Sequence, residues 1–396
     1  MLETWRWFGP DDPVTLANAK QAGASGIVTA LHHMNQGGVW PADEILKRRK
    51  QVEDAGLAWS VVESIGVGEE IKTRTGNFRE KIDNYKQSIR NVARAGVKVI
   101  CYNFMVITDW SRTNLMYKLP DGGYALRYDS IDFAAYDLFV LKRKGAEADY
   151  SADRIKEAER RFKSMSEVQV DALEKVLIDW LPARDFAYNR ESFKRMLELY
   201  HEIKTDELRA NLIAFVNEIS PVAEEEGARL CIHPDDPSFP IFGLPRVMST
   251  AEDVRALFAG VPNQACGLTL CTGSFGSNPK NDLVAMAEEF APRVHFVHLR
   301  NTRHEADGSF YEADHLDGDT DLIGVAAAMM SEETRRAAEG RPDAQIPMRP
   351  DHGHLLGDDV DKKMNPGYSF VGRLKGLAEL RGVMRTVDAF RSGRIN

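Results

Sequence analysis

Residues 348–369 read MRPDHGHLLGDDVDKKMNPGYS, and this stretch shows the unit from which the fold is built. A short apolar run leads into it, and a helical pattern begins at Phe370. A strand, a polar turn and a helix in this order make one β/α unit of a parallel α/β fold. The turn carries Asp351, His352 and Tyr368, so the same stretch also offers side chains for metal binding and proton transfer.

Working outward from this stretch, the chain alternates between short apolar segments and helical patterns. The predicted strands are 3–8, 25–31, 57–62, 97–103, 228–232, 265–270, 294–297 and 346–348. Eight such segments, each followed by a helix or a helical insertion, predict a (β/α)8 TIM barrel. The competing fold is an open doubly wound sheet. No GxGxxG follows any strand and no GxxxxGK[ST] is present, so a nucleotide-binding sheet of that kind loses support.

The alternation breaks after the fourth strand. Residues 104–189 are charged and mostly helical in pattern, with a turn at 120–123. No Gly/Ser-rich or Pro-rich linker frames this segment, so we interpret it as a helical insertion within a single domain that spans 1–396. Its role stays open between a lid and a subunit contact.

Composition restricts the classes of function. The 396 residues are 43% hydrophobic, enough for a large core, yet no apolar run approaches the ~20 residues of a membrane span. The net charge of −9 argues against nucleic acid and anionic membranes as the main partner. The four cysteines lack CxxC spacing and the N-terminus lacks a signal-peptide pattern, so we expect a reduced, cytoplasmic protein.

The last four predicted strands each end in a residue that can bind a metal ion. These residues are His233, Cys271, His298 and Asp351. The carboxyl ends of barrel strands meet around one axis, so we expect the four side chains to converge on one divalent cation. Ligands from different strands favour a catalytic site with open positions over a structural zinc site. Thiolate, carboxylate and imidazole together suit Mn²⁺, Fe²⁺ or Zn²⁺, and the residues alone do not choose among them.

Taken one at a time, these residues have simpler explanations. A cysteine at a strand end is usually a small buried side chain, and a lone histidine is usually a hydrogen-bonded structural residue. The joint pattern favours metal binding. The other cysteines (Cys101, Cys231, Cys266) are expected in the core, and the other isolated histidines (His201, His295, His304, His315) are expected to be structural or at the surface.

Further polar residues near the strand ends are candidates for catalysis and for substrate binding. His352 and Tyr368 are candidates for proton transfer, against the alternatives of a loop histidine and a packing tyrosine. The candidates for binding a carboxylate, if they do not form structural salt bridges, are Arg300, Arg349 and Arg373. The candidates for binding sugar hydroxyls are His32, His33, Glu63 and Asn103. Asp235 and Asp236 either support the metal ligands from behind or cap a helix.

The motifs together resemble the mannonate dehydratase family. The resemblance is carried by TWRWFGPDDPV (4–14), GIVTALHH (26–33), WSVVESI (59–65), CYNFM (101–105), HPDDPSFPIFGLPR (233–246), LCTGS (270–274), HLRNT (298–302), IPMRPDHGH (346–354) and NPGYSFVGRLKGLAELRG (365–382). These segments run over essentially the whole chain. The resemblance implies a xylose-isomerase-like barrel whose one Mn²⁺ or Fe²⁺ ion, without an organic cofactor, serves the conversion of D-mannonate to 2-keto-3-deoxy-D-gluconate in hexuronate (glucuronate) breakdown.

On this resemblance the family's metal ligands correspond to His233, Cys271, His298 and Asp351, and its acid and base correspond to His352 and Tyr368. Which of the last two is the base stays open. The competing interpretations are a metal-dependent sugar isomerase or epimerase on a related barrel, and a non-catalytic protein that binds a sugar acid or a metal. A homo-oligomer, dimeric or larger, is compatible with the sequence.

Overall fold

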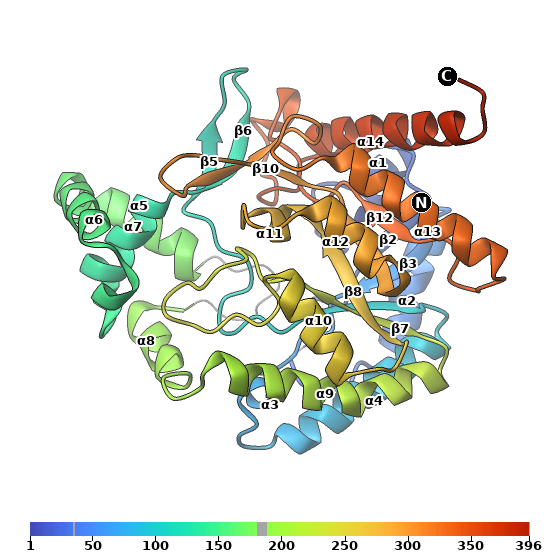
Figure 1. Cartoon of the computed structure of the whole chain (residues 1–396), viewed down its shortest axis with the longest axis horizontal. Coiled ribbons are helices and arrows are strands. Elements are labelled where there is room, and N and C mark those ends of the chain that lie inside the picture. Colours follow the sequence, from blue (N-terminus) through green and yellow to red (C-terminus); the bar gives the residue numbers. More distant parts are fainter. Residues whose placement is uncertain (35, 180–187, 396) are drawn as a thin grey trace.

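The computed structural model describes residues 1–34, 36–179 and 188–395, and its centre is a closed barrel of parallel strands (Figure 1). Around the barrel the order is β1, β12, β9, β8, β7, β4, β3 and β2. The strands are β1 (Leu2–Arg6), β2 (Gly26–Thr29), β3 (Ala58–Glu63), β4 (Val99–Asn103), β7 (Arg229–His233), β8 (Cys266–Cys271), β9 (Val294–His298) and β12 (Pro347–Arg349). All eight strands predicted from the sequence are present, so the predicted (β/α)8 barrel is confirmed.

The strands are apolar because both of their faces are covered. Every residue of β8 and β9 is buried. A small cluster fills the inside of the barrel and comprises Val28, Val61, Cys101, Cys231 and Phe296. The outward-facing side chains join the main core beneath the helices, and Cys266 belongs to this second layer. The three cysteines expected in the core are therefore buried.

Helices follow the strands and cover the barrel. Up to the second half of the barrel they are α1 (Leu16–Gln21), α2 (Ala42–Asp54), α3 (Glu69–Thr73), α4 (Phe78–Arg94), α5 (Ser130–Ala135), η1 (Tyr136–Leu141), η2 (Ala146–Asp149), α6 (Ala152–Ser164), α7 (Glu167–Glu174), η3 (Lys175–Asp179), α8 (Arg190–Glu198) and α9 (Thr205–Glu225). The later ones are α10 (Ala251–Gly260), α11 (Thr272–Gly276), α12 (Leu283–Phe290), η4 (Ala291–Arg293), α13 (Leu322–Ala338), η5 (Gly357–Asp359) and α14 (Phe370–Arg391). Among the described residues, no helix combines the length and the apolar composition that crossing a membrane requires.

A second, four-stranded sheet adds a hairpin to the segment after β4, whose remaining described elements are helices, as predicted. Its strands are β5 (Asn114–Lys118), β6 (Tyr124–Tyr128), β10 (Asn301–His304) and β11 (Phe310–Ala313), in the order β10, β11, β6, β5. The predicted turn at 120–123 joins β5 to β6. These strands were missed because β5 is exposed or half-buried throughout, and because β6 finds its partner β11 far away in the sequence.

The helices of the predicted insertion follow this hairpin. In Figure 1, α5, α6 and α7 lie at the left edge of the molecule, on the side opposite the N-terminus. Residues 180–187 of the predicted insertion lie outside the described residues. The assignment of 1–396 to a single domain stays a prediction.

The register of the parallel strands brings their polar ends to one level. Asn103 at the end of β4 is in register with His233 at the end of β7. Cys271 of β8 is in register with His298 of β9, which in turn is in register with Arg349 of β12. Side chains that lie far apart in the sequence therefore meet at the carboxyl end of the barrel.

Candidate metal centre and active site

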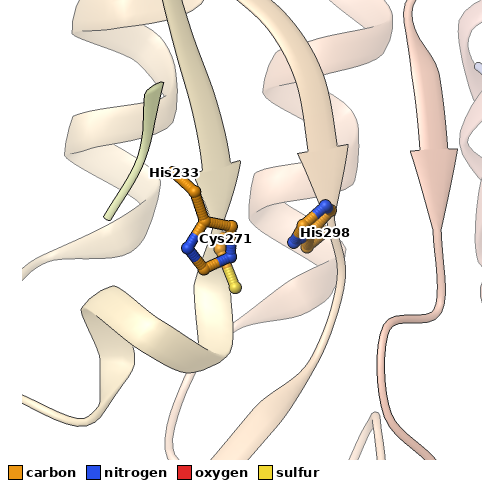
Figure 2. A group of neighbouring side chains, drawn as sticks. All are labelled: His233, Cys271 and His298. Carbon is orange, nitrogen blue, oxygen red and sulfur yellow. The ribbon is translucent and has the colours of Figure 1, made fainter. Parts of the chain in front are cut away.

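Three of the predicted metal ligands converge at this end of the barrel. His233 ends β7, Cys271 ends β8 and His298 ends β9. Each offers one ligand atom, and the three atoms lie within 4.8 Å of one another. Figure 2 shows His298 at the tip of its strand, with the other two side chains beside it. The barrel geometry therefore assembles the His–Cys–His group that strand-end positions predicted.

The hydrogen bonding of the two imidazoles fits metal coordination. Among the described residues, neither ring nitrogen of His298 has a hydrogen-bond partner, although both are buried. A buried polar atom of this kind is costly unless another group binds it. His233 Nδ1 lies 2.8 Å from the carbonyl oxygen of Pro234. Donation from Nδ1 to that carbonyl leaves the lone pair on Nε2, which is the arrangement found in metal-binding histidines.

The electrostatics of the group also fit a cation. Burial, together with nearby Arg349, lowers the pKa of His298 well below its usual value, so this imidazole is neutral at pH 7. At His233 burial lowers the pKa, but Cys271, with Cys101 and Glu63, outweighs burial and raises the pKa to about 10. The sulfur therefore favours a positive charge beside it. Thiolate and imidazole donors together suit Mn²⁺, Fe²⁺ or Zn²⁺.

Asp351, the fourth predicted ligand, lies next to this group and faces two arginines. Its Oδ2 is 3.6 Å from Cys271 Sγ and 3.1 Å from Arg300 Nη1, and its Oδ1 pairs with Arg349. Burial raises the pKa of Asp351, but the two arginines outweigh burial and hold it well below its usual value. The ionised carboxylate thus lies within reach of the metal group, and its role as a ligand stays a prediction.

Replacing Cys271 with serine is expected to weaken metal retention by about tenfold or more, because a hard hydroxyl replaces a thiolate ligand. The measurement is metal content per chain after dialysis against a chelator. Cys266→Ser is the matched control, since Cys266 begins the same strand and points into the core, and it should retain metal. Equal retention in both variants would remove Cys271 from the ligand set.

Two of the candidate ligands, His233 and Asp351, line a cavity of about 70 Å³ that is also lined by His352 and Tyr368. His352 Nε2 is 3.3 Å from the Tyr368 hydroxyl. Burial, opposed by nearby Arg349, raises the pKa of Tyr368 to about 12, so the phenol keeps its proton at neutral pH. The two predicted catalytic residues are therefore adjacent and face the same space as the metal group.

Four of the predicted substrate-binding residues line this cavity: Glu63, Asn103, Arg300 and Arg349. Arg349 Nη2 pairs with Glu63 Oε1 at 2.9 Å. Burial raises the pKa of Glu63, but Arg349, His298 and Arg6 outweigh it and lower the pKa to about 2. Ionised acids and arginines therefore alternate around the wall, which suits a small, highly hydroxylated anion.

The other two predicted substrate-binding residues lie behind the wall. His32 lines a second small cavity of about 60 Å³ that shares Asn103 with the first, and its Nε2 is 3.3 Å from Arg6 Nη2. Arg373 donates from Nη1 to the Arg6 carbonyl oxygen at 2.8 Å and from Nη2 to the Tyr368 carbonyl oxygen at 3.0 Å. Its guanidinium therefore supports the backbone that carries Tyr368.

The remaining candidates have structural partners. Asp235 Oδ2 accepts hydrogen bonds from the backbone nitrogens of Val247 and Met248 and so fixes a loop. Asp236 supports the site from behind, as one alternative anticipated, by pairing with Arg300 at 2.6 Å. The four histidines expected outside the site are held by local acids or carbonyls: His201 by Glu202, His295 by Gln264, His304 by Asp319 and His315 by Pro350.

Sequence analysis missed Arg6, Arg112 and Glu312. Arg6 ends β1 and pairs with Glu63 at 3.5 Å, but the predicted strand ran on to residue 8, so the strand-end rule did not select it. Arg112 Nη2 pairs with Glu312 Oε1 at 2.8 Å in the buried wall of the site. Neither of these two residues follows a barrel strand, and no local signal marks them. Their position depends on the second sheet.

Fold and site together define a (β/α)8-barrel enzyme with a candidate metal centre at the carboxyl ends of its strands. Residues 1–393 match the model of a family described as D-mannonate dehydratase (UxuA). The chain belongs to this family.

Relatives agree with this assignment. The mannonate dehydratase of Saccharophagus degradans is 53% identical over 389 residues, which cover 98% of each chain. The crystal structure of mannonate dehydratase from Streptococcus suis serotype 2 has a TM-score of 0.77 and 34% identity, covering 99% of this chain and 95% of that one. A xylose isomerase-like TIM barrel/4-hydroxyphenylpyruvate dioxygenase fusion protein, with a TM-score of 0.50 and 11% identity over 99% of this chain and 44% of that one, shares the fold alone.

Proposed function

We propose that this enzyme removes water from D-mannonate to give 2-keto-3-deoxy-D-gluconate, with one Mn²⁺ or Fe²⁺ ion held by His233, Cys271, His298 and Asp351. The observation that carries the proposal is the convergence of three ligand atoms within 4.8 Å, beside a cavity that His233 lines together with His352 and Tyr368. Family membership over 1–393 supports the dehydratase activity. No organic cofactor is needed, because the reaction moves protons and water only.

The chemistry explains what the site must supply. The proton on C2 is weakly acidic because the neighbouring carboxylate is already negative. When bound, the metal ion supplies a positive charge that stabilises the negative charge growing on that carboxylate. Hydroxide is a poor leaving group, so the C3 hydroxyl needs a proton as its bond to carbon breaks. The enol product then tautomerises to the 2-keto acid.

His352 and Tyr368 divide the two proton transfers in this proposal. The His352 Nε2 faces the cavity and the Tyr368 hydroxyl, so it can accept the proton from C2. Tyr368, whose pKa is raised to about 12 by burial against the opposing effect of Arg349, carries a proton to give to the departing hydroxyl. The released group leaves as water, and the protons balance.

The wall of the cavity orients the substrate. Arg300 and Arg349 lie beside the ligand group and offer planar donors for the substrate carboxylate. Glu63 and Asn103 face the polyol hydroxyls, and His32 completes this side from the neighbouring cavity. Arg373 is the last of the proposed substrate-binding residues. It acts from behind Tyr368, because it donates a hydrogen bond to the Tyr368 carbonyl oxygen.

Incubation of the metal-loaded enzyme with D-mannonate is expected to release a 2-keto-3-deoxy acid, which periodate and thiobarbiturate convert to a coloured product. Keto-acid release from D-gluconate, the C2 epimer, is measured in parallel to test how strictly the site discriminates the configuration at C2. To identify the metal that supports turnover, the metal-free protein is reloaded with Mn²⁺, Fe²⁺ or Zn²⁺ and the kcat values are compared. Binding of mannonate without any colour after reloading would contradict the proposed activity.

An isomerase or epimerase is not favoured by the site. Such enzymes typically hold their metal with several carboxylates from different strands, whereas the ligand group here is His233, Cys271 and His298. An isomerised sugar would give no thiobarbiturate colour, so the same assay separates the two activities. We place the enzyme in the cytoplasm, where its four free, buried cysteines would stay reduced, and we propose a homo-oligomer of a dimer or more.

A further inference from the structure

The histidine proposed as the base has a buried carboxylate at its other ring nitrogen. Glu312 Oε2 lies 2.8 Å and Oε1 2.9 Å from His352 Nδ1. On the opposite side of the ring, Nε2 is 3.3 Å from the Tyr368 hydroxyl. Glu312 is 3% exposed and His352 is 4% exposed, so water does not compete for this contact. Arg300 Nη1 lies 2.9 Å from Nδ1 and 3.5 Å from Nε2, but the carboxylate faces Nδ1 and the phenol faces Nε2.

The groups around Glu312 keep it ionised. Arg112 Nη2 lies 2.8 Å and Arg300 Nη1 3.6 Å from its Oε1. Burial raises the pKa of Glu312, but His352, Arg300 and Arg112 outweigh it and lower the pKa to about 2. An ionised carboxylate only accepts hydrogen bonds. The nitrogen that it contacts at 2.8 Å must therefore carry a proton.

Arg300 is the competing partner of the same nitrogen. Its Nη1 lies 2.9 Å from His352 Nδ1, and a guanidinium only donates. However, that Nη1 also has Asp351 Oδ2 as an acceptor at 3.1 Å. A lone pair on Nδ1 would instead face both oxygens of the Glu312 carboxylate at hydrogen-bond distance. The contacts favour the tautomer with the proton on Nδ1 and the lone pair on Nε2.

We propose that Glu312 is a positioning residue that holds His352 in this tautomer, and that Arg112 holds Glu312 in place. The proposal rests on the function proposed above for His352, whose Nε2 must be free to accept a proton. It gives the second sheet a part in the reaction. Glu312 lies on β11, which pairs with β6, and Arg112 precedes β5, so both residues are brought to the site by elements outside the barrel.

The Glu312→Gln variant tests the tautomer. Because Arg112 only donates, the glutamine must turn its oxygen towards Arg112 and its NH₂ group towards His352 Nδ1. That NH₂ group competes with the remaining oxygen, which is 2.9 Å from Nδ1, so the preference for a proton on Nδ1 is weakened. We expect kcat to fall by roughly 10²- to 10⁴-fold, while KM for mannonate, metal content and thermal unfolding stay close to wild type. A kcat within about twofold of wild type would overturn the proposal.

Two further glutamate variants separate positioning from general disruption. Glu312→Asp keeps the negative charge and is expected to lose less turnover than Glu312→Gln; the reverse order would argue against the proposal. Glu305→Gln is the matched control, because Glu305 lies in the turn between β10 and β11 and binds Arg127 at 2.6 Å. Its kcat is expected to stay unchanged, and a loss equal to that of Glu312→Gln would point to disruption of the second sheet instead.

A double variant separates this inference from the function on which it rests. If Glu312 acts through His352, adding Glu312→Gln to His352→Asn lowers kcat no further, whereas independent losses that multiply would overturn the inference. If His352→Asn alone leaves kcat unchanged, the proposed function of His352 is wrong. If His352→Asn abolishes turnover but Glu312→Gln does not affect it, only the inference about Glu312 is wrong.

Discussion

Tyr368→Phe is expected to lower kcat by roughly 10²- to 10⁴-fold, which is the usual contribution of a positioned acid or base. The phenol keeps its proton at neutral pH, because burial, against the effect of Arg349, raises its pKa to about 12. Phenylalanine leaves the C3 hydroxyl without a donor. The measurements are kcat with D-mannonate and metal content per chain, and the second should not change.

The fold should tolerate this substitution. The Tyr368 ring packs edge-on against Phe8 at a centroid distance of 4.7 Å, and phenylalanine preserves that contact. Tyr85→Phe is the matched control, since it removes another buried hydroxyl, 3.4 Å from the Ile65 carbonyl oxygen. It should change stability slightly and leave kcat unchanged. Wild-type turnover by Tyr368→Phe would exclude this hydroxyl as the acid and as the base.

Arg112→Met is expected to reduce the free energy of unfolding by about 3–5 kcal/mol, because it removes one partner from a fully buried charge cluster. Arg112 Nη1 lies 2.7 Å from Asp236 Oδ1, and its Nη2 lies 2.8 Å from Glu312 Oε1. The guanidinium is completely buried, so the two carboxylates would lose a partner that water cannot replace. The measurement is urea denaturation at pH 7.

A surface arginine provides the comparison. Arg255 Nη2 pairs with Glu289 Oε2 at 2.6 Å, and both side chains are at least 41% exposed. Arg255→Met is therefore expected to leave the urea midpoint close to that of wild type, because exposed ion pairs are weak. If the Arg112 variant lost no more than the Arg255 variant, the buried cluster would not be a source of stability.

Arg112 and Arg300 join the same two buried carboxylates, Asp236 and Glu312. Asp236 pairs with both arginines. Glu312 pairs with Arg112 and with the imidazole of His352. Such a cluster is stable only when every charge in it has a partner. Residues from the loop after β7, from β11 and from the segment before β5 thus share one set of charges with His352.

The barrel was predictable because its signal is local. Each strand is a short apolar segment that ends in a polar residue, and each is followed by a helical pattern, so the order β1 to β12 around the barrel follows from the sequence. The second sheet was not predictable in this way. Strand β5 alternates between exposed and half-buried residues, and β11 has only four residues, so neither resembles a buried strand.

The residues of the site likewise fall into those that a local pattern predicts and those that it does not. His233, Cys271 and His298 could be predicted to meet because barrel strands carry their last residues to one place, and His352 and Tyr368 lie in the loop after the final strand. Glu312 and Arg112 could not be predicted to meet them, since nothing in their local sequence distinguishes them from surface charges.

By itself, then, the sequence determined the barrel, its strand ends and the candidate metal ligands on three of them, because periodicity along the chain encodes which face of each element is buried. Only the tertiary structure decided which acid faces His352 and that Asp351 lies between Arg300 and Arg349. The physical reason is that these contacts join segments that are distant in the sequence, and such pairing depends on packing that no local pattern records.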